Sequence, residues 1–144
     1  MYIAVDFDGT IVEHKYPSIG KEIPFAVMTL KKLQKEGHQL ILWSVREGEL
    51  LDEAVEWCKE RGLEFYSVNR DHPGEGMEPT DGARKLCVDM FIDDRNVGGI
   101  PDWGVIYQVV HDGLTYAEYY RRLFNSQPLE KSSFWSRLTG KSER

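Results

Sequence analysis

The chain alternates short apolar blocks with longer amphipathic stretches, a pattern that predicts strands separated by helices. The apolar blocks have the β-branched character of buried strands, as in residues 2–7 and 39–43. In the stretch 24–36, apolar residues recur at helical spacing, with Pro24 at the start and Gly37 after the end. The expected strands are residues 2–7, 39–43, 65–68, 90–92 and 105–110, and the expected helices are residues 24–36, 47–61, 81–87 and 115–124.

Strands that alternate with helices form a mostly parallel sheet, because a helix returns the chain between parallel strands. We therefore expect an α/β fold with three layers, a doubly wound sheet carrying helices on both faces. A chain of 144 residues with 41% hydrophobic content fits one domain. We assign residues 1–124 to this domain and residues 125–144 to a basic tail, flexible or folded into a short helix.

Charge and cysteine content narrow the class of protein. The chain has 18 Lys and Arg against 24 Asp and Glu, a net charge of −6. This balance lacks the excess positive charge that drives nonspecific binding to nucleic acid or to an anionic membrane. No apolar run approaches the roughly 20 residues of a membrane-spanning helix. Cys58 and Cys87 lack metal-site spacing, and we interpret both as buried thiols of a cytoplasmic protein.

Polar side chains follow three of the expected strands at the points where those strands end. Asp6 and Asp8 follow the first, Ser44 follows the second, and Asp93 and Asp94 follow the fourth. The carboxyl ends of parallel strands meet at one edge, so these residues should gather in one crevice. Gathered carboxylates repel unless some are protonated or a cation joins them. Oxygen ligands without a His or Cys cluster favour Mg²⁺ with a phosphoryl group.

These residues also match the motifs of a known family. The sequence DFDGT at 6–10, then Ser44, Lys85 and the pair Asp93-Asp94 resemble the four motifs of the haloacid dehalogenase (HAD) superfamily of phosphohydrolases. The resemblance covers roughly residues 1 to 100 and implies a Rossmann-like core. Family members usually carry a cap domain, but the loops 10–23 and 69–80 are too short for one. The resemblance therefore implies the capless type.

The resemblance implies catalytic roles for individual positions. Asp6 would attack phosphorus and form an aspartyl-phosphate, and Asp8 would protonate the leaving oxygen and then activate water. Ser44 would hold a phosphoryl oxygen, and Lys85 would neutralise charge on the transferring group. Because residues two apart on an extended backbone point the same way, Asp6 and Asp8 should face one substrate. Arg46 is a candidate substrate or phosphate contact.

The resemblance also implies a Mg²⁺ site. Its ligands would be the Asp6 carboxylate, the Asp8 backbone carbonyl and the Asp93 carboxylate, with Asp94 orienting a metal-bound water. Taken one at a time, these residues have structural alternatives. Carboxylates after a strand often cap a helix or form a turn, and Ser44 could cap the segment that follows it. Lys85 could lie on a solvated helix face, and Arg46 could form a salt bridge.

Two other functions share some of these features. A phosphorylation-dependent receiver domain is also a parallel α/β protein with acids, a hydroxyl residue and a Lys at its strand ends. Its acidic pair comes first along the chain, whereas here the pair follows Lys85. A catalytically inactive relative would bind a phosphorylated ligand without turnover.

The expected substrate remains broad. An open crevice would admit a phosphorylated small molecule or the phosphorylated end of a macromolecule, including nucleic acid, although the net charge does not indicate the latter. A second subunit could also cover the crevice, which would make the protein a homo-oligomer.

Overall fold

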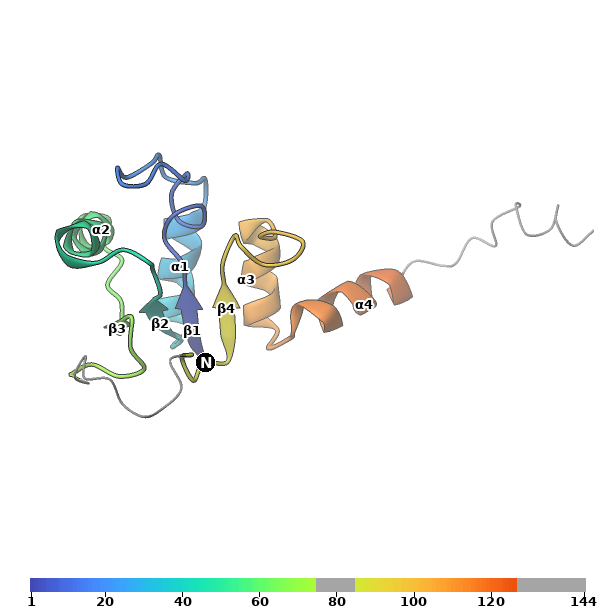
Figure 1. Cartoon of the computed structure of the whole chain (residues 1–144). Coiled ribbons are helices and arrows are strands. Elements are labelled where there is room, and N and C mark those ends of the chain that lie inside the picture. Colours follow the sequence, from blue (N-terminus) through green and yellow to red (C-terminus); the bar gives the residue numbers. More distant parts are fainter. Residues whose placement is uncertain (75–84, 127–144) are drawn as a thin grey trace, which may run out of the picture.

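The computed structural model describes residues 1–74 and 85–126, which form an α/β fold around one parallel sheet (Figure 1). The strands lie in the order β3-β2-β1-β4, and every pairing between them is parallel. Their bounds are β1 Tyr2–Val5, β2 Gln39–Leu42, β3 Ser67–Val68 and β4 Met90–Ile92. The predicted parallel α/β architecture is confirmed, with the third strand shorter than expected.

The register of the three longer strands aligns their carboxyl ends. Val5 of β1 lies opposite Leu42 of β2 and Ile92 of β4. The backbone pairing continues one step further, since the N–H of Asp6 donates to the carbonyl of Ile92 at 2.9 Å. Chain segments that follow these strands therefore start side by side at one edge of the sheet.

Two of the predicted helices lie where the pattern placed them. Helix α1 spans Ala26–Lys35 and α2 spans Gly48–Glu60, each within a few residues of its expected bounds. Their buried residues follow the predicted stripes, including Leu30 and Leu33 on α1 and Ala54 on α2. Hydrophobic spacing therefore located these elements.

The predicted strand 105–110 is wrong, because this segment belongs to helix α3, Trp103–His111. Its β-branched residues favour a strand locally, but the helical arrangement buries Trp103, Ile106 and Val110 on one side. Asp102 begins the helix by accepting a hydrogen bond from the Gly104 N–H at 2.8 Å. Packing against the core and this cap outweigh the local strand preference.

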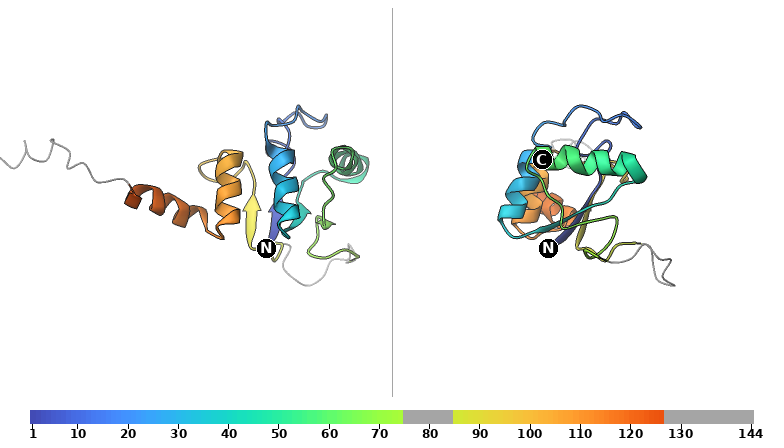
Figure 2. Two further views of the ribbon diagram at one scale, coloured as in Figure 1. Left: turned by 180° about the vertical axis from the view of Figure 1, so that it is seen from behind. Right: turned by 90° about the vertical axis from the view of Figure 1, so that its left-hand side faces the viewer.

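The main core lies on one face of the sheet. Helices α1, α2 and α3 all contribute buried side chains to it, and α1 and α3 lie on the same side of the strands (Figure 2). The core contains Ile3, Val5, Phe7, Leu30, Leu33, Leu40, Leu42, Ala54, Cys58, Ile92, Trp103, Ile106 and Val110 among others.

The opposite face carries a smaller cluster of Ala4, Ile41 and Leu86, to which no helical residue of the described ranges belongs. Helices on both faces are therefore not confirmed by the described residues. The predicted helix 81–87 lies mostly outside them.

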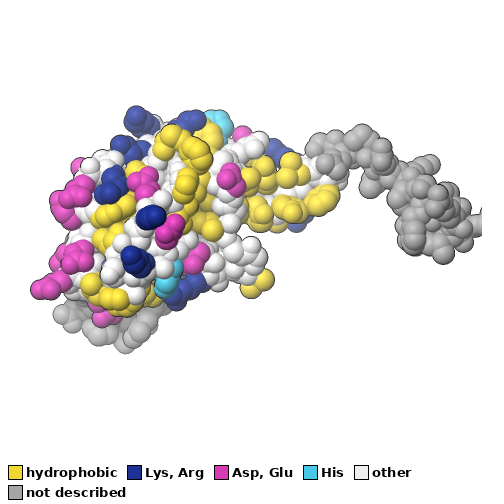
Figure 3. Space-filling model, turned by 90° about the horizontal axis from the view of Figure 1, so that it is seen from above, with side chains coloured by type: hydrophobic (Ala, Val, Ile, Leu, Met, Phe, Trp, Pro, Cys, Tyr) yellow, Lys and Arg dark blue, Asp and Glu magenta, His cyan; other side chains and the backbone are white. Residues whose placement is uncertain are grey.

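The last helix leaves the body of the molecule. Helix α4 spans Tyr116–Ser126, close to the predicted 115–124, and extends away from the sheet (Figure 1). Hydrophobic side chains lie along it where it projects (Figure 3), and Tyr120 and Phe124 are exposed there. The helix continues two residues into the segment predicted as a tail, and residues 127–144 lie outside the described part.

The two cysteines differ in their surroundings. Cys58 is buried in the main core, as predicted. Cys87 is exposed, so its prediction as a buried thiol is wrong. Its neighbour Leu86 takes the buried position on the sheet, and the Cys87 N–H donates to Asp71 Oδ1 at 2.7 Å. Across the described ranges, every helix is too short or too polar to cross a bilayer.

Candidate functional site

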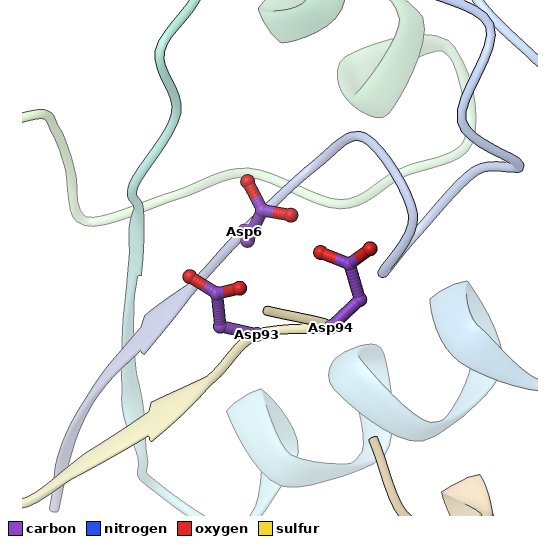
Figure 4. A group of neighbouring side chains, drawn as sticks. All are labelled: Asp6, Asp93 and Asp94. Carbon is purple, nitrogen blue, oxygen red and sulfur yellow. The ribbon is translucent and has the colours of Figure 1, made fainter. Parts of the chain in front are cut away.

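Three carboxylates converge where β1 and β4 end. Asp6 follows β1, Asp93 and Asp94 follow β4, and one oxygen from each lies within 4.8 Å of the others (Figure 4). The parallel pairing of β1 with β4 causes this meeting, because it aligns the ends of two strands that are distant in sequence. The predicted gathering of Asp6, Asp93 and Asp94 is confirmed.

Thr10 links the two halves of this carboxylate cluster. Its buried hydroxyl donates to Asp6 Oδ2 at 3.0 Å and accepts from the Asp94 N–H at 3.1 Å. One side chain therefore fixes the Asp6 carboxylate relative to the backbone of the other strand end. Thr10 thereby orients the turn after β1 against the end of β4.

Gly9 permits the close approach of Asp94. Its φ of 94° lies in the left-handed region, which disfavours residues with a side chain. A Cβ at this position would lie 2.3 Å from Asp94 Oδ2. Glycine is therefore required here, because any side chain would push the turn after β1 away from the Asp94 carboxylate.

The electrostatics of the cluster favour a cation. Burial raises the pKa of Asp6 to about 6, and the charges of Asp93 and Asp94 add to this, while hydrogen bonds from Phe7 and Thr10 act in the opposite direction. Within the described residues, Asp94 Oδ1 is a buried atom with no hydrogen-bond partner. A hard divalent cation would offset the repulsion between the carboxylates and give Asp94 Oδ1 a partner. Three carboxylates with no His or Cys among them suit Mg²⁺ rather than zinc.

Asp8 lies outside the cluster. Its carboxylate is 5% exposed and pairs with the fully buried Arg46, whose Nε and Nη2 donate to Asp8 Oδ2 and Oδ1, both at 2.7 Å. In this arrangement Asp6 and Asp8 do not face one substrate, because β1 ends at Val5. The backbone then turns at Phe7, so alternation along a strand no longer applies.

The surroundings of Arg46 decide between its two predicted roles. Besides Asp8, the guanidinium donates to the carbonyls of Pro17 at 2.9 Å and Ser18 at 3.0 Å. It has no exposed surface. The prediction of a substrate contact is therefore wrong for this arrangement, and the salt-bridge alternative is correct. The carbonyl of Asp8, the predicted metal ligand, lies 3.5 Å from His14 Nδ1, and that ligand role stays a prediction.

Ser44 occupies a turn between β2 and α2. Its backbone N–H donates to Asn69 Oδ1 at 2.8 Å, and its carbonyl accepts from Asn69 Nδ2 at 2.9 Å. Its hydroxyl oxygen accepts from the Arg46 N–H at 3.2 Å. The alternative that Ser44 caps the following helix is wrong, because α2 begins at Gly48 and Glu47 takes the N-cap position. The hydroxyl hydrogen remains for donation to another group. Asn69 was not predicted as a site residue. It directly follows the third expected strand, and this place in the sequence is the signal that could have identified it. In the structure its backbone has a φ of 53°.

Lys85 lies beside the cluster in a hollow of about 380 Å³. It shares this hollow with Asp93, and its Nζ lies 5.5 Å from the centre of the Phe91 ring. The remaining lining residues are Trp43 and Asn96. The structure thus places Lys85 in the same hollow as Asp93, while the aromatic walls were not predicted from the sequence.

Comparisons with known proteins give one relative. No family model matches the chain, and no curated protein matches it. Among solved structures, the chain is similar to a conserved protein from Bacteroides thetaiotaomicron, with 68% sequence identity and a TM-score of 0.76. The match covers 83% of this chain and 97% of that chain. At this identity and coverage, the chain belongs to the same family as the Bacteroides protein.

Proposed function

We propose that the protein is a Mg²⁺-dependent phosphatase that hydrolyses a phosphomonoester through an aspartyl-phosphate on Asp6. The observation that carries this proposal is the convergence of the Asp6, Asp93 and Asp94 carboxylates, of which the buried Asp94 Oδ1 has no hydrogen-bond partner among the described residues. The proposal includes the HAD-like, doubly wound core without a cap domain that the motifs imply. Its substrate is a phosphorylated small molecule or the phosphorylated end of a macromolecule.

The carboxylates of Asp6, Asp93 and Asp94 would hold the metal ion. A bound Mg²⁺ would offset the mutual repulsion of these groups and polarise a phosphoryl oxygen. Thr10 keeps Asp6 Oδ2 in place through its hydrogen bond, so the nucleophile approaches phosphorus from a fixed position. Lys85, in the hollow next to Asp93, adds positive charge for the phosphoryl oxygens.

The reaction has two steps. In the first, an Asp6 carboxylate oxygen bonds to phosphorus, the bond from phosphorus to the leaving oxygen breaks, and that oxygen takes up a proton. In the second, water attacks the same phosphorus and loses a proton, which releases inorganic phosphate and restores the Asp6 carboxylate. The Ser44 hydroxyl hydrogen, which its contact with Arg46 leaves available, would bind a phosphoryl oxygen.

Asp8 is the proposed proton donor and acceptor in these steps. Both of its oxygens accept hydrogen bonds from Arg46, so the side chain must turn away from Arg46 to reach the leaving oxygen. The ion pair with Arg46 therefore holds the Asp8 side chain in a resting conformation. Catalysis requires a second conformation, in which Asp8 faces the leaving oxygen.

The Arg46–Asp8 pair also favours a second candidate function. With Asp8 held by Arg46, Asp6 could accept a phosphoryl group that water then removes slowly. The protein would in that case act as a phosphorylated regulatory domain, like a receiver, rather than as an enzyme with turnover. The order of the motifs argues against a receiver, because the acidic pair follows Lys85.

The test is phosphate release from an aryl phosphate, nucleotides and sugar phosphates, with and without Mg²⁺. We expect release by the wild type with Mg²⁺ and none by Asp6→Asn, which removes the nucleophile at nearly constant volume. Asp52→Asn, an exposed acid on α2, serves as the matched control and should retain the wild-type rate. Release that survives Asp6→Asn would contradict the proposal. Stable phosphorylation of Asp6 without release would favour the regulatory domain.

A further inference from the structure

The open face of the sheet continues directly into the carboxylate cluster. Side chains on a strand alternate between faces, so a residue two positions beyond another lies on the same side. On the face opposite the helices, β1, β2 and β4 carry Ala4, Ile41 and Phe91. Two positions further on, one residue past the end of each strand, come Asp6, Trp43 and Asp93. The ladder still holds at this step, since the Asp6 N–H donates to the Ile92 carbonyl and the Trp43 N–H to the Val5 carbonyl.

A hollow of about 380 Å³ lies at this edge. Trp43 and Phe91 supply its apolar walls, and both are half-buried, so part of each ring faces the hollow. Asp93 belongs both to the hollow and to the carboxylate cluster. A group bound in the hollow would therefore lie next to a phosphoryl group held at the carboxylates.

The aromatic walls of the hollow pack on the open face of the sheet. Leu86 is 6% exposed and forms a buried cluster with Ala4 and Ile41, and Trp43 and Phe91 pack against this cluster. The two aromatic residues are thus held by the sheet on one side and free toward the hollow on the other. Their positions are fixed by the fold, which makes them suitable as a binding surface.

The spacing of the walls suits a flat ligand. Trp43 follows β2 and Phe91 lies on β4, with β1 between them. Neighbouring strands lie nearly 5 Å apart, so β2 and β4 are about 10 Å apart. The register also places Trp43 two positions further along the sheet than Phe91. Two aromatic side chains at this separation leave space for a planar ring in contact with one or both of them.

Polar groups lie beside the aromatic walls of the hollow. Asn96 Nδ2 already donates to the Asp93 carbonyl at 2.7 Å, and Lys85 Nζ lies 5.5 Å from the centre of the Phe91 ring. The other polar groups of the described lining are the Asp93 carboxylate and the indole N–H of Trp43. An aromatic ring in contact with Trp43 or Phe91 requires few polar partners.

We propose that this hollow binds the leaving group of the substrate and that the leaving group is a planar aromatic ring, as in an aryl phosphate. The inference rests on the proposed function, because it takes the carboxylate cluster as the place of the phosphoryl group. Hydrolysis would then break the bond between phosphorus and the phenolic oxygen and release a phenol.

The first experiment measures binding without turnover. Phenylphosphonate and methylphosphonate carry a phosphorus–carbon bond that hydrolysis does not break, so both bind as intact ligands. In the presence of Mg²⁺, we expect the wild type to bind phenylphosphonate about tenfold more tightly than methylphosphonate, because one aromatic contact would provide this difference. Isothermal titration calorimetry gives both dissociation constants. Equal affinities, or no binding of either phosphonate, would overturn the inference.

The second experiment uses variants. Trp43→Leu and Phe91→Leu keep apolar volume but remove the ring, and each should reduce the preference for phenylphosphonate several-fold. Phe124→Leu, an exposed aromatic residue on α4, is the matched control and should keep the preference. Thermal melting identifies a variant that fails to fold, and the wild-type comparison stands without any variant. A preference that persists in both folded hollow variants would contradict the assignment.

Turnover separates this inference from the function on which it rests. If phenylphosphonate binds preferentially but no phosphoester is hydrolysed, the hollow is supported and the phosphatase proposal fails. If phosphoesters are hydrolysed through Asp6 but the two phosphonates bind equally, the phosphatase proposal stands and the aromatic site is wrong. For an active enzyme, Phe91→Leu should raise the KM for phenyl phosphate and leave the KM for glycerol phosphate unchanged.

Discussion

Arg46 and Asp8 form a two-point ion pair with both N···O distances at 2.7 Å, although 38 positions separate them in the sequence. Arg46 is fully buried and Asp8 is 5% exposed. The same guanidinium holds the carbonyls of Pro17 and Ser18, so one side chain joins the turn after β1, the following loop and the segment before α2. The loop beside the candidate site is thereby attached to the sheet.

Removing Arg46 should destabilise the protein strongly. Arg46→Ala would leave the Asp8 carboxylate buried and unpaired, a change that costs about 3–5 kcal/mol in comparable pairs. Chemical denaturation measures the free energy of unfolding. Lys59→Ala is the control, because its pair with Glu56 is exposed and long at 3.7 Å, and such pairs contribute about 1 kcal/mol or less. Equal losses in the two variants would show that the buried pair is unimportant for stability.

Gly9→Ala should weaken Mg²⁺ binding as well as stability. The new Cβ would overlap Asp94 Oδ2 and would also require a left-handed backbone at a residue with a side chain. Gly37→Ala separates the two effects, since Gly37 has a φ of 90° but no atom of the described residues lies within 4 Å of the added Cβ.

Calorimetric titration with Mg²⁺ should give a reduced affinity for Gly9→Ala alone. Thermal melting should show lowered stability for both glycine variants. Unchanged Mg²⁺ affinity in a folded Gly9→Ala protein would remove Asp94 from the proposed metal site.

The raised pKa of Asp6 predicts a pH-dependent effect of Asp6→Asn on stability. Burial raises this pKa from 3.8 to about 6, so between these values the folded state holds a proton that the unfolded state has lost. Burial of Asp6 therefore does not lower the free energy of unfolding below about pH 4, where the group is protonated in both states. It lowers that free energy by the full amount above about pH 6, where the group is ionised in both states. In metal-free buffer, Asp6→Asn should be more stable than the wild type at pH 7.5, and the difference should shrink toward pH 4.

Mg²⁺ should offset the loss of stability that ionised Asp6 causes in the wild type. The ion competes with the proton for Asp6, so it should raise the melting temperature at pH 7.5 more than at pH 5. Melting curves with EDTA or with Mg²⁺ test both expectations, with Asp52→Asn as the control. A stabilisation by Mg²⁺ that does not vary with pH would exclude Asp6 as the competing group.

The two thiols should react at very different rates. Burial raises the pKa of Cys58 to about 12, which suppresses the reactive thiolate, whereas Cys87 is exposed. A thiol reagent such as DTNB should therefore modify one cysteine rapidly in the native protein and the other only after unfolding. Cys87→Ser should remove the rapid phase, and Cys58→Ser should leave it intact. Similar rates for both thiols would show that Cys58 is accessible.

The sequence predicted features that depend on periodicity and on strand ends. Apolar spacing located β1, β2, α1 and α2, because these elements bury a regular stripe or block. The rule that parallel strands end at one edge brought Asp6 and Asp93 together, as the structure confirms. Such features are local or follow from topology, so a pattern in the chain is enough to identify them.

The remaining features depend on contacts between distant residues. The segment 103–111 is rich in β-branched residues, and packing against the core makes it a helix. Arg46 pairs with Asp8 because the turn after Val5 redirects that carboxylate, which strand alternation does not describe. The hollow formed by Trp43 and Phe91 requires the register of three strands. No spacing along the sequence encodes these relationships.

The pairing of β4 with β1 rather than with β3 divides the site between distant parts of the chain. A cut between residues 74 and 85 would place Asp6 and Thr10 on one fragment, and Asp93 and Asp94 on the other. Neither fragment would contain the complete carboxylate cluster. If the cluster binds Mg²⁺ as proposed, binding by a mixture of the two fragments would report their reassembly, as a split metal sensor requires.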